Sequence, residues 1–159
     1  MPPVSLVLAT RSAQYVGGLE EYRFRDVIEW PAFFSVAMIA AARAARDLAL
    51  RIEELADAWL ERLGNPRSDA SSRTIIDRLA AEPIITIIRA AELAGGSGTA
   101  ADNATRALDA AGILTRIDEQ RWGRRWEATD VLALLDDFER ELATPDGDHR
   151  AMPPAPRAP

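Results

Sequence analysis

The chain has 159 residues, of which 48% are hydrophobic, enough for one ordinary domain or two very small ones. It has no cysteine, which excludes disulfides and thiolate metal sites, and its one histidine, His149, lies in a Pro-rich tail. A histidine-based active site or zinc site is therefore excluded within this chain. All 19 basic residues are arginine, against 25 acidic ones, and the net charge of −6 argues against strong non-specific attraction to nucleic acid.

The sequence predicts no membrane span. Its most apolar stretch, residues 31–50, meets Arg43 and Arg46 before it reaches the roughly 20 apolar residues that a bilayer requires. The first ten residues have no basic region before their short apolar run, so they make a poor signal peptide. We therefore expect a cytoplasmic bacterial protein with no membrane contact.

The N-terminal part predicts a short helix followed by a long one. Over residues 11–24, Tyr15, Leu19 and Tyr22 fall on one helical face, although a Gly-Gly pair between them costs stability. The second helix begins near Pro31 and runs for about 33 residues to the stop signal Gly64-Asn65-Pro66, a length of about 50 Å.

The long helix carries an apolar seam with alternating spacings of four and three residues. Packing against the preceding helix and the domain that follows would cover this seam. A partner chain or a missing domain could cover it as well, and both interpretations stay open. The candidate partner seam is Phe34, Met38, Leu48, Ile52, Leu55 and Trp59.

The remaining elements predict a winged helix. After a polar boundary at residues 64–72, with Ser71 or Ser72 as a helix N-cap, the order is helix, strand, helix, turn, helix, strand, wing and strand. The five residues IITII at 84–88 are either the first strand or the lead into the next helix. Ser97 can cap the recognition helix, and Gly112 permits the left-handed conformation that ends it before Ile113 and Leu114 begin the wing.

The fold class is therefore mainly α, with an N-terminal helical segment that contains one long helix and a winged helix-turn-helix domain with a small β-wing. The predicted domains are residues 1–66, residues 67–142 and a disordered Pro-rich tail at 143–159.

The outward face of the recognition helix and the wing are the candidate nucleic-acid interface. Arginine and asparagine can meet base edges or phosphates, whereas Asp102 and Asp109 on the same face would repel a polyanion. The wing arginines could instead stay solvated or pair with Asp118, Glu119 and Glu127. The candidate residues are Thr99, Asn103, Arg106, Arg121, Arg124 and Arg125.

The charge of the predicted winged helix favours a protein-contact role. Residues 68–142 carry 9 arginines and 14 acidic residues, a balance of −5. Domains that bind duplex DNA are usually basic on the binding face, because phosphate neutralisation supplies most of the affinity.

The combination of motifs resembles the C-terminal part of bacterial Fic-family proteins over roughly residues 2–142. These are the opening PPVSLVLATRSAQYVGGLEEYR, then IEWPAFFSVAMIAAARAA, then ELADAWLERL, and the winged helix. The resemblance rests on Pro3, Ser5, Leu8, Tyr15, Leu19, Trp30, Phe33, Phe34, Trp59, Ala101, Leu108, Gly112, Ile113 and Leu114.

The resemblance implies a parent protein that transfers AMP from ATP, with magnesium, to a hydroxyl side chain of a target protein. That family uses a histidine followed by a Gly-Asn-Gly-Arg loop. The loop is absent here and the one histidine lies in the tail, so no catalytic residue and no cofactor is assigned to this chain. We expect a non-catalytic module that contacts the Fic catalytic core or another protein. The alternative is a DNA-binding transcriptional regulator in which the long helix pairs two subunits into a homodimer. A stand-alone enzyme is disfavoured.

Overall fold

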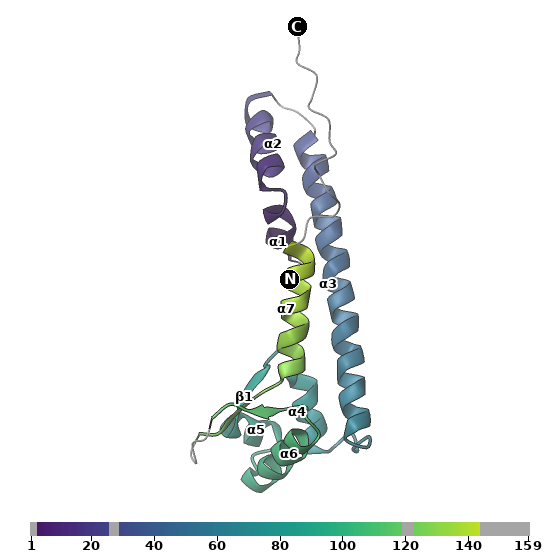
Figure 1. Cartoon of the computed structure of the whole chain (residues 1–159), viewed down its shortest axis with the longest axis vertical. Coiled ribbons are helices and arrows are strands. Elements are labelled where there is room, and N and C mark those ends of the chain that lie inside the picture. The colour runs from purple at the N-terminus through teal and green to yellow at the C-terminus, as the bar shows by residue number, and fades with distance from the viewer. Residues whose placement is uncertain (1–2, 26–28, 119–122, 144–159) are drawn as a thin grey trace. The chain divides into compact units, whose positions relative to one another are not determined.

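A computed structural model describes residues 3–25, 29–118 and 123–143 of the protein. Within these residues the fold is mainly helical, with seven helices and one small antiparallel sheet of three strands (Figure 1). The chain divides into two compact units. Unit 1 comprises residues 1–46 and 137–159, and unit 2 comprises residues 47–136.

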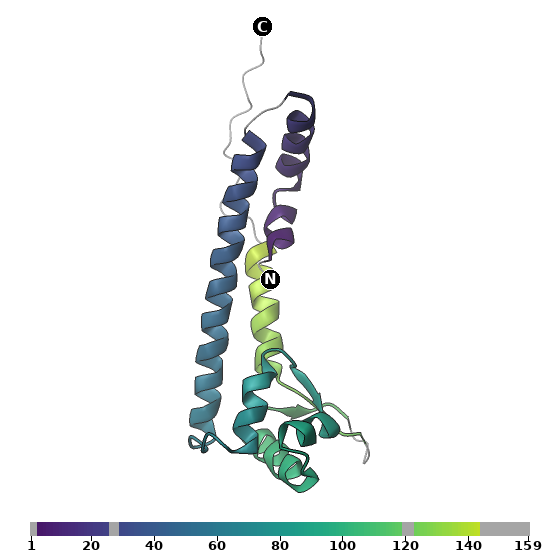
Figure 2. The ribbon, with the colours of Figure 1, turned by 180° about the vertical axis from the view of Figure 1, so that it is seen from behind.

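Unit 1 is built from helices α1 (Val4–Ala9) and α2 (Ser12–Arg25) and the first part of α3 (Glu29–Arg62). Helix α2 agrees with the predicted helix at 11–24, whereas α1 was not predicted. In both views α2 lies beside the start of α3 (Figures 1 and 2). A small core of Val7, Ala37 and Ala41 holds the unit together, and Leu142, near the end of helix α7 (Thr129–Ala143), packs against it.

Four aromatic rings link α2 to α3 around Trp30. The Trp30 ring stacks on Phe34 with ring centroids 5.3 Å apart, and Tyr22 and Tyr15 of α2 lie 5.7 and 6.1 Å from it. Gly18 makes room for this contact, because a Cβ at that position would lie 3.0 Å from Cδ1 of Trp30. The glycine that weakens α2 as an isolated helix therefore lets it approach α3.

Helix α3 has 34 residues and confirms the predicted long helix. It ends at Arg62, just before the expected stop signal. Gly64 and Asn65 have left-handed φ angles of 73° and 54°, and the Asn65 N–H donates to the Leu60 carbonyl at 2.8 Å.

Unit 2 contains the small sheet. Its strand order is β1-β3-β2, with Ile85 opposite Trp126 and Thr115 opposite Glu127. Figures 1 and 2 show three short helices, α4 (Ser71–Leu79), α5 (Ile87–Leu93) and α6 (Gly98–Ala110), grouped with this sheet. The elements are α4 (Ser71–Leu79), β1 (Ile84–Thr86), α5 (Ile87–Leu93), α6 (Gly98–Ala110), β2 (Thr115–Arg116), β3 (Arg125–Glu127) and the start of α7 (Thr129–Ala143).

The core of unit 2 includes the last turns of α3. Trp59 is only 2% exposed, and its indole N–H donates to Oδ2 of Asp130 at 3.0 Å. Because Trp59 and Leu60 pack with the following helices, the compact unit begins within α3 and not at the predicted boundary after residue 66. The buried side chains of this core include Trp59, Leu60, Ile75, Ile76, Leu79, Ile85, Leu108, Ile113, Leu114, Trp126 and Val131.

Three local details differ from the sequence expectations or decide between them. Helix α4 has Ala70 at its N-cap with no side-chain bond, so the predicted cap by Ser71 or Ser72 was wrong. Ile113 and Leu114 do not begin a strand, because both N–H groups donate to the Leu108 carbonyl at the end of α6. The segment IITII supplies both β1 and the start of α5, with the Thr86 hydroxyl accepting from the Arg89 N–H at 3.1 Å.

No helix in the described part of the chain is long and apolar enough to cross a membrane.

Candidate functional site

Helix α6 sets the orientation of the candidate nucleic-acid residues. The Ser97 hydroxyl accepts from the Ala100 N–H at 3.2 Å, which caps the start of the helix as predicted, and Gly112 (φ 66°) follows its end. Ala101, Ala104, Thr105 and Leu108 are buried against the core of unit 2. Thr99, Asn103, Arg106 and Asp109 are consequently exposed on the outward face, as the helical spacing predicts.

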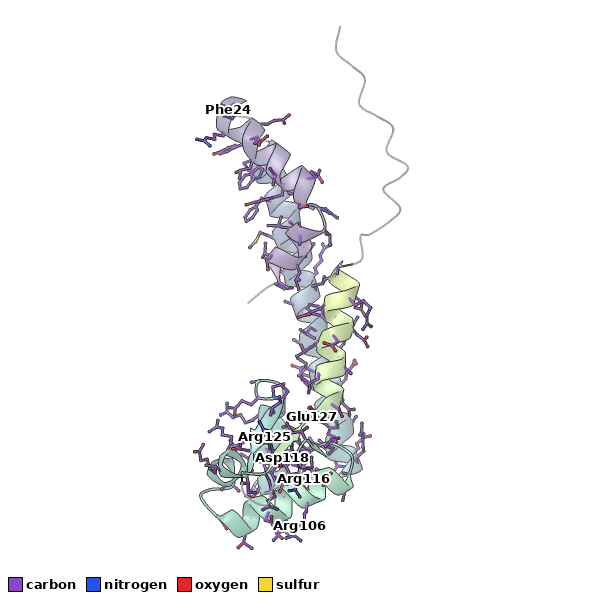
Figure 3. The ribbon with its side chains drawn as sticks, turned by 60° about the vertical axis from the view of Figure 1, so that its left-hand side comes forward. Phe24, Arg106, Arg116, Asp118, Arg125 and Glu127 are labelled. Atoms are coloured by element: carbon purple, nitrogen blue, oxygen red, sulfur yellow. The ribbon has the colours of Figure 1, made fainter. Side chains whose placement is uncertain are left out.

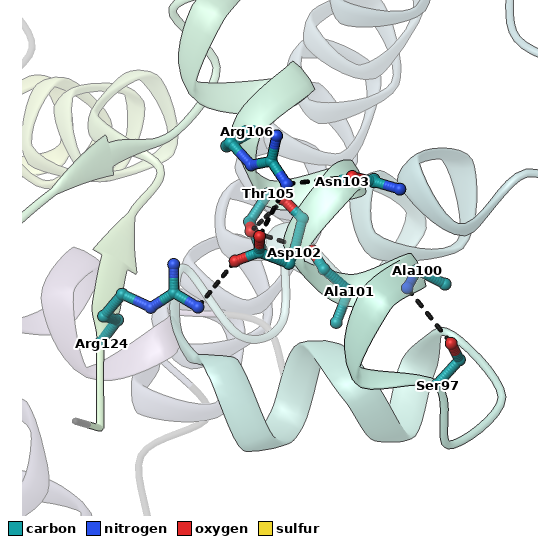
Figure 4. Close-up of polar contacts among 8 residues, drawn as sticks. All are labelled: Ser97, Ala100, Ala101, Asp102, Asn103, Thr105, Arg106 and Arg124. Carbon is teal, nitrogen blue, oxygen red and sulfur yellow. Dashed lines mark hydrogen bonds and ion pairs between the residues drawn. The ribbon is translucent and has the colours of Figure 1, made fainter. Parts of the chain in front are cut away.

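Asp102 lies between two arginines from different elements (Figure 4). Its Oδ2 is 2.7 Å from Nη2 of Arg106, one turn further along α6, and the same Nη2 is 3.1 Å from Oδ1 of Asn103. Its Oδ1 is 2.7 Å from Nη2 of Arg124, which immediately precedes β3. The Arg124 contact is an ion pair.

This arrangement keeps Asp102 ionised and neutralises its charge locally. The contacts with Arg106, and then with Arg124, hold the pKa of the Asp102 carboxyl below its ordinary value. The Asp102 side chain is 31% exposed, whereas that of Arg106 is 68% exposed. By the sequence alone Asp102 is a negative charge on the reading face that would repel a polyanion, whereas in the structure two arginines compensate this charge.

A second carboxylate has the same kind of surroundings at the end of β2 (Figure 3). Asp118 Oδ2 accepts from Nε of Arg125 on β3 at 3.2 Å, and its Oδ1 lies 3.8 Å from Nε of Arg116 on β2. The Asp118 side chain is only 11% exposed. One interpretation of the sequence was that wing arginines pair with Asp118. Arg125 forms this pair, whereas its neighbour Arg124 pairs with Asp102.

Arg124 is further fixed by its own strand. Its guanidinium lies over the ring of Trp126, 5.5 Å from the centroid, and its carbonyl accepts from the Ile87 N–H at 2.9 Å. Both the backbone and the side chain of Arg124 are therefore held in place.

The structure groups part of the predicted interface. Asn103, Arg106 and Arg124 come together around Asp102, while Arg125 belongs to the Asp118 cluster and Thr99 lies exposed in the first turn of α6. Arg121 lies outside the described residues. The bridging role of Asp102 could not be inferred from the sequence, because Arg124 is distant along the chain and meets α6 only through the folding of β3.

The predicted partner seam of α3 is covered unevenly. Trp59 is buried in the core of unit 2, and the partly buried Leu55 packs against that core. Phe34 lies in the aromatic cluster around Trp30, and Leu48 and Ile52 are half-buried. Met38 is the exposed member of the seam.

Unit 1 exposes seven large apolar side chains, and all of them except Met38 lie outside the predicted seam. Phe24 at the end of α2 is the most exposed of them, at 79%. The set is Val16, Leu19, Tyr22 and Phe24 on α2, and Val36, Met38 and Ile39 on α3.

The described residues contain no group of three or more His, Cys, Asp or Glu side chains that could hold a metal ion.

No protein-family model matches this chain, and no curated protein matches it either.

Proposed function

We propose that this chain is the non-catalytic C-terminal part of a Fic-family, AMP-transferring protein, and that it serves in protein contact, target recognition or regulation. The observation that carries the proposal is the open apolar surface of unit 1. Seven large apolar side chains of α2 and α3 are exposed there. Exposed apolar side chains gathered on neighbouring elements mark contact sites with other proteins.

The residues behind the family resemblance support this proposal. Tyr15, Trp30 and Phe34 belong to the resemblance, and all three are members of the aromatic cluster that joins α2 to α3. These residues therefore shape the same pair of helices that exposes the apolar surface. A catalytic core packed on α2 and α3 would remove that surface from water, at a gain of roughly 25 cal/mol per Å².

We also propose that residues 67–142 form a winged helix. The order α4, β1, α5, α6, β2, β3 and the antiparallel pairing of β3 with both other strands support it. In that fold α6 is the recognition helix, and β2 and β3 flank the wing.

The proposal is tested by the reading frame directly upstream of residue 1 and by co-purification. The frame should encode a histidine followed by a Gly-Asn-Gly-Arg loop, and that segment, expressed as a separate chain, should co-purify with this one. Phe24→Asp with Val36→Asp should abolish the co-purification, because each places a charge in the apolar contact.

Leu50→Asp is the matched control, since Leu50 is an exposed apolar residue of α3 that belongs to unit 2. An upstream frame without the catalytic motif would refute the proposal.

Duplex DNA binding is the second candidate function, and the surroundings of Asp102 favour it. The acidic residue that argued most directly against a DNA-reading face is paired with Arg106 and Arg124. What opposes this candidate is Asp109 on the same helix and the acidic balance of residues 68–142.

A further inference from the structure

We propose that Asp102 is a positioning residue for a phosphate-binding surface: it holds Arg106 and Arg124 in place to grip the backbone of duplex DNA, so that this acidic side chain increases the affinity. The inference rests on the second candidate function, DNA binding. Simple charge repulsion would make Asp102 lower the affinity for DNA, whereas the proposed role makes it raise that affinity.

The bridge uses only part of the donor capacity of each arginine. A guanidinium group carries donors on Nε, Nη1 and Nη2 in a fixed fork. Asp102 engages Nη2 of Arg106 and Nη2 of Arg124. Its contact therefore leaves the Nε and Nη1 donors of both side chains outside the bridge.

The contacts of Arg106 and Arg124 in the free protein lower the entropic cost of binding phosphate. An unrestrained arginine loses rotamer freedom when a ligand immobilises it. Arg124 is held before binding by Asp102, by the Trp126 ring and by its strand, and Arg106 is held by Asp102 and Asn103. Part of the ordering that a phosphate contact requires is thus already achieved in the free protein.

The bridge carries a net positive charge, and its two arginines come from different elements. Two arginines around one carboxylate leave a net positive charge, and the Arg106 side chain is largely exposed. The bridge also joins the proposed recognition helix α6 to the first residue before β3, so the two cations project from two different elements. The Asp118 cluster in unit 2, with Arg125 and Arg116, has the same composition of two arginines around one carboxylate.

The test measures binding of the full chain to a short mixed-sequence DNA duplex over a series of salt concentrations. Asp102→Ala should weaken binding about 5- to 10-fold at low salt, because two arginines lose their orientation. It should also reduce the slope of log K against log salt by about 1, since about one phosphate contact is lost. Asp102→Asn keeps one oxygen acceptor and should fall between the wild type and Asp102→Ala.

Asp109→Asn is the matched control, because Asp109 is an exposed carboxylate on the same outward face of α6. It removes a repulsive charge without touching the bridge, so it should strengthen binding. In an Arg106→Ala/Arg124→Ala background, Asp102→Asn should no longer weaken binding. Circular dichroism of each free variant shows whether α6 remains folded.

The outcomes separate the two proposals. A wild-type chain that does not bind the duplex at low salt would overturn both the DNA-binding function and the role of Asp102. A wild type that binds, with Asp102→Asn and Asp109→Asn both binding more tightly, would leave DNA binding intact and refute positioning. Weakening by Asp102→Asn that persists without the two arginines would also refute it.

Discussion

Arg89 shows how single charged residues tie the short helices of unit 2 together. Its Nε and Nη2 donate to Oε2 and Oε1 of Glu82 at 2.8 and 2.7 Å, and its Nη1 donates to Glu92 at 2.8 Å. Glu82 lies beyond the end of α4, whereas Arg89 and Glu92 lie on α5. The two-pronged contact with Glu82 therefore connects consecutive helices across β1.

This contact predicts an acid-sensitive contribution to stability. Hydrogen bonding to Arg89 lowers the pKa of Glu82 below 4.5. The contribution is thus complete above pH 4.5 and is lost as the pH falls through the lower value in the folded protein. Glu82→Gln should show a smaller decrease in Tm than the wild type between about pH 7 and about pH 3, measured by circular dichroism.

Glu61→Gln serves as the control, because it removes an exposed carboxylate of α3 and should leave the acid sensitivity unchanged. If Glu82→Gln and the wild type lose the same number of degrees, the salt bridge does not contribute as inferred.

At the scale of elements, the two adjacent glycines of α2 have different roles. A Cβ at Gly17 would meet nothing within 4 Å, whereas a Cβ at Gly18 would lie 3.0 Å from Cδ1 of Trp30. The sequence treats both as equal costs to the helix, because propensity depends on the residue type alone. The packing of Trp30 distinguishes them.

Alanine substitutions test this difference directly. Gly17→Ala should stabilise unit 1 by about 0.5–1 kcal/mol, since it restricts the unfolded chain without disturbing a contact. Gly18→Ala should give a clearly lower stability than Gly17→Ala, because the added methyl group displaces the indole. Thermal unfolding measures the order of the two, and equal stability would show that α2 does not pack on Trp30 as closely as described.

At the scale of the whole molecule, the charge of −6 limits any binding to nucleic acid. Binding that depends on a few arginines in an acidic chain must weaken steeply as salt is added, because counterion release supplies its free energy. Arg124→Ala and Arg125→Ala should each reduce the slope of log K against log salt by about 1.

Arg43→Ala is the control for this series, since Arg43 is exposed on α3 in unit 1 and outside the proposed surface. The DNA-binding hypothesis fails if wild-type affinity does not change with salt, or if the two wing variants keep the wild-type slope.

The sequence by itself determined the elements whose signals are local. The long helix α3 follows from its apolar spacing and its Gly-Asn stop, and α6 follows from the Ser97 cap, the buried small residues and Gly112. The outward position of Asn103 and Arg106 follows from the same spacing, because helical geometry alone fixes which residues share a face.

Only the tertiary structure decided which groups meet across elements. It paired Arg124 with Asp102 and Arg125 with Asp118, and it placed Trp59 in a core with helices that follow it in the chain. No local rule contains these contacts, since they depend on how β3 approaches α6 and on how α4 packs against α3. The sequence gives the charge of each residue, but which neighbouring charges compensate it is decided only when the chain folds.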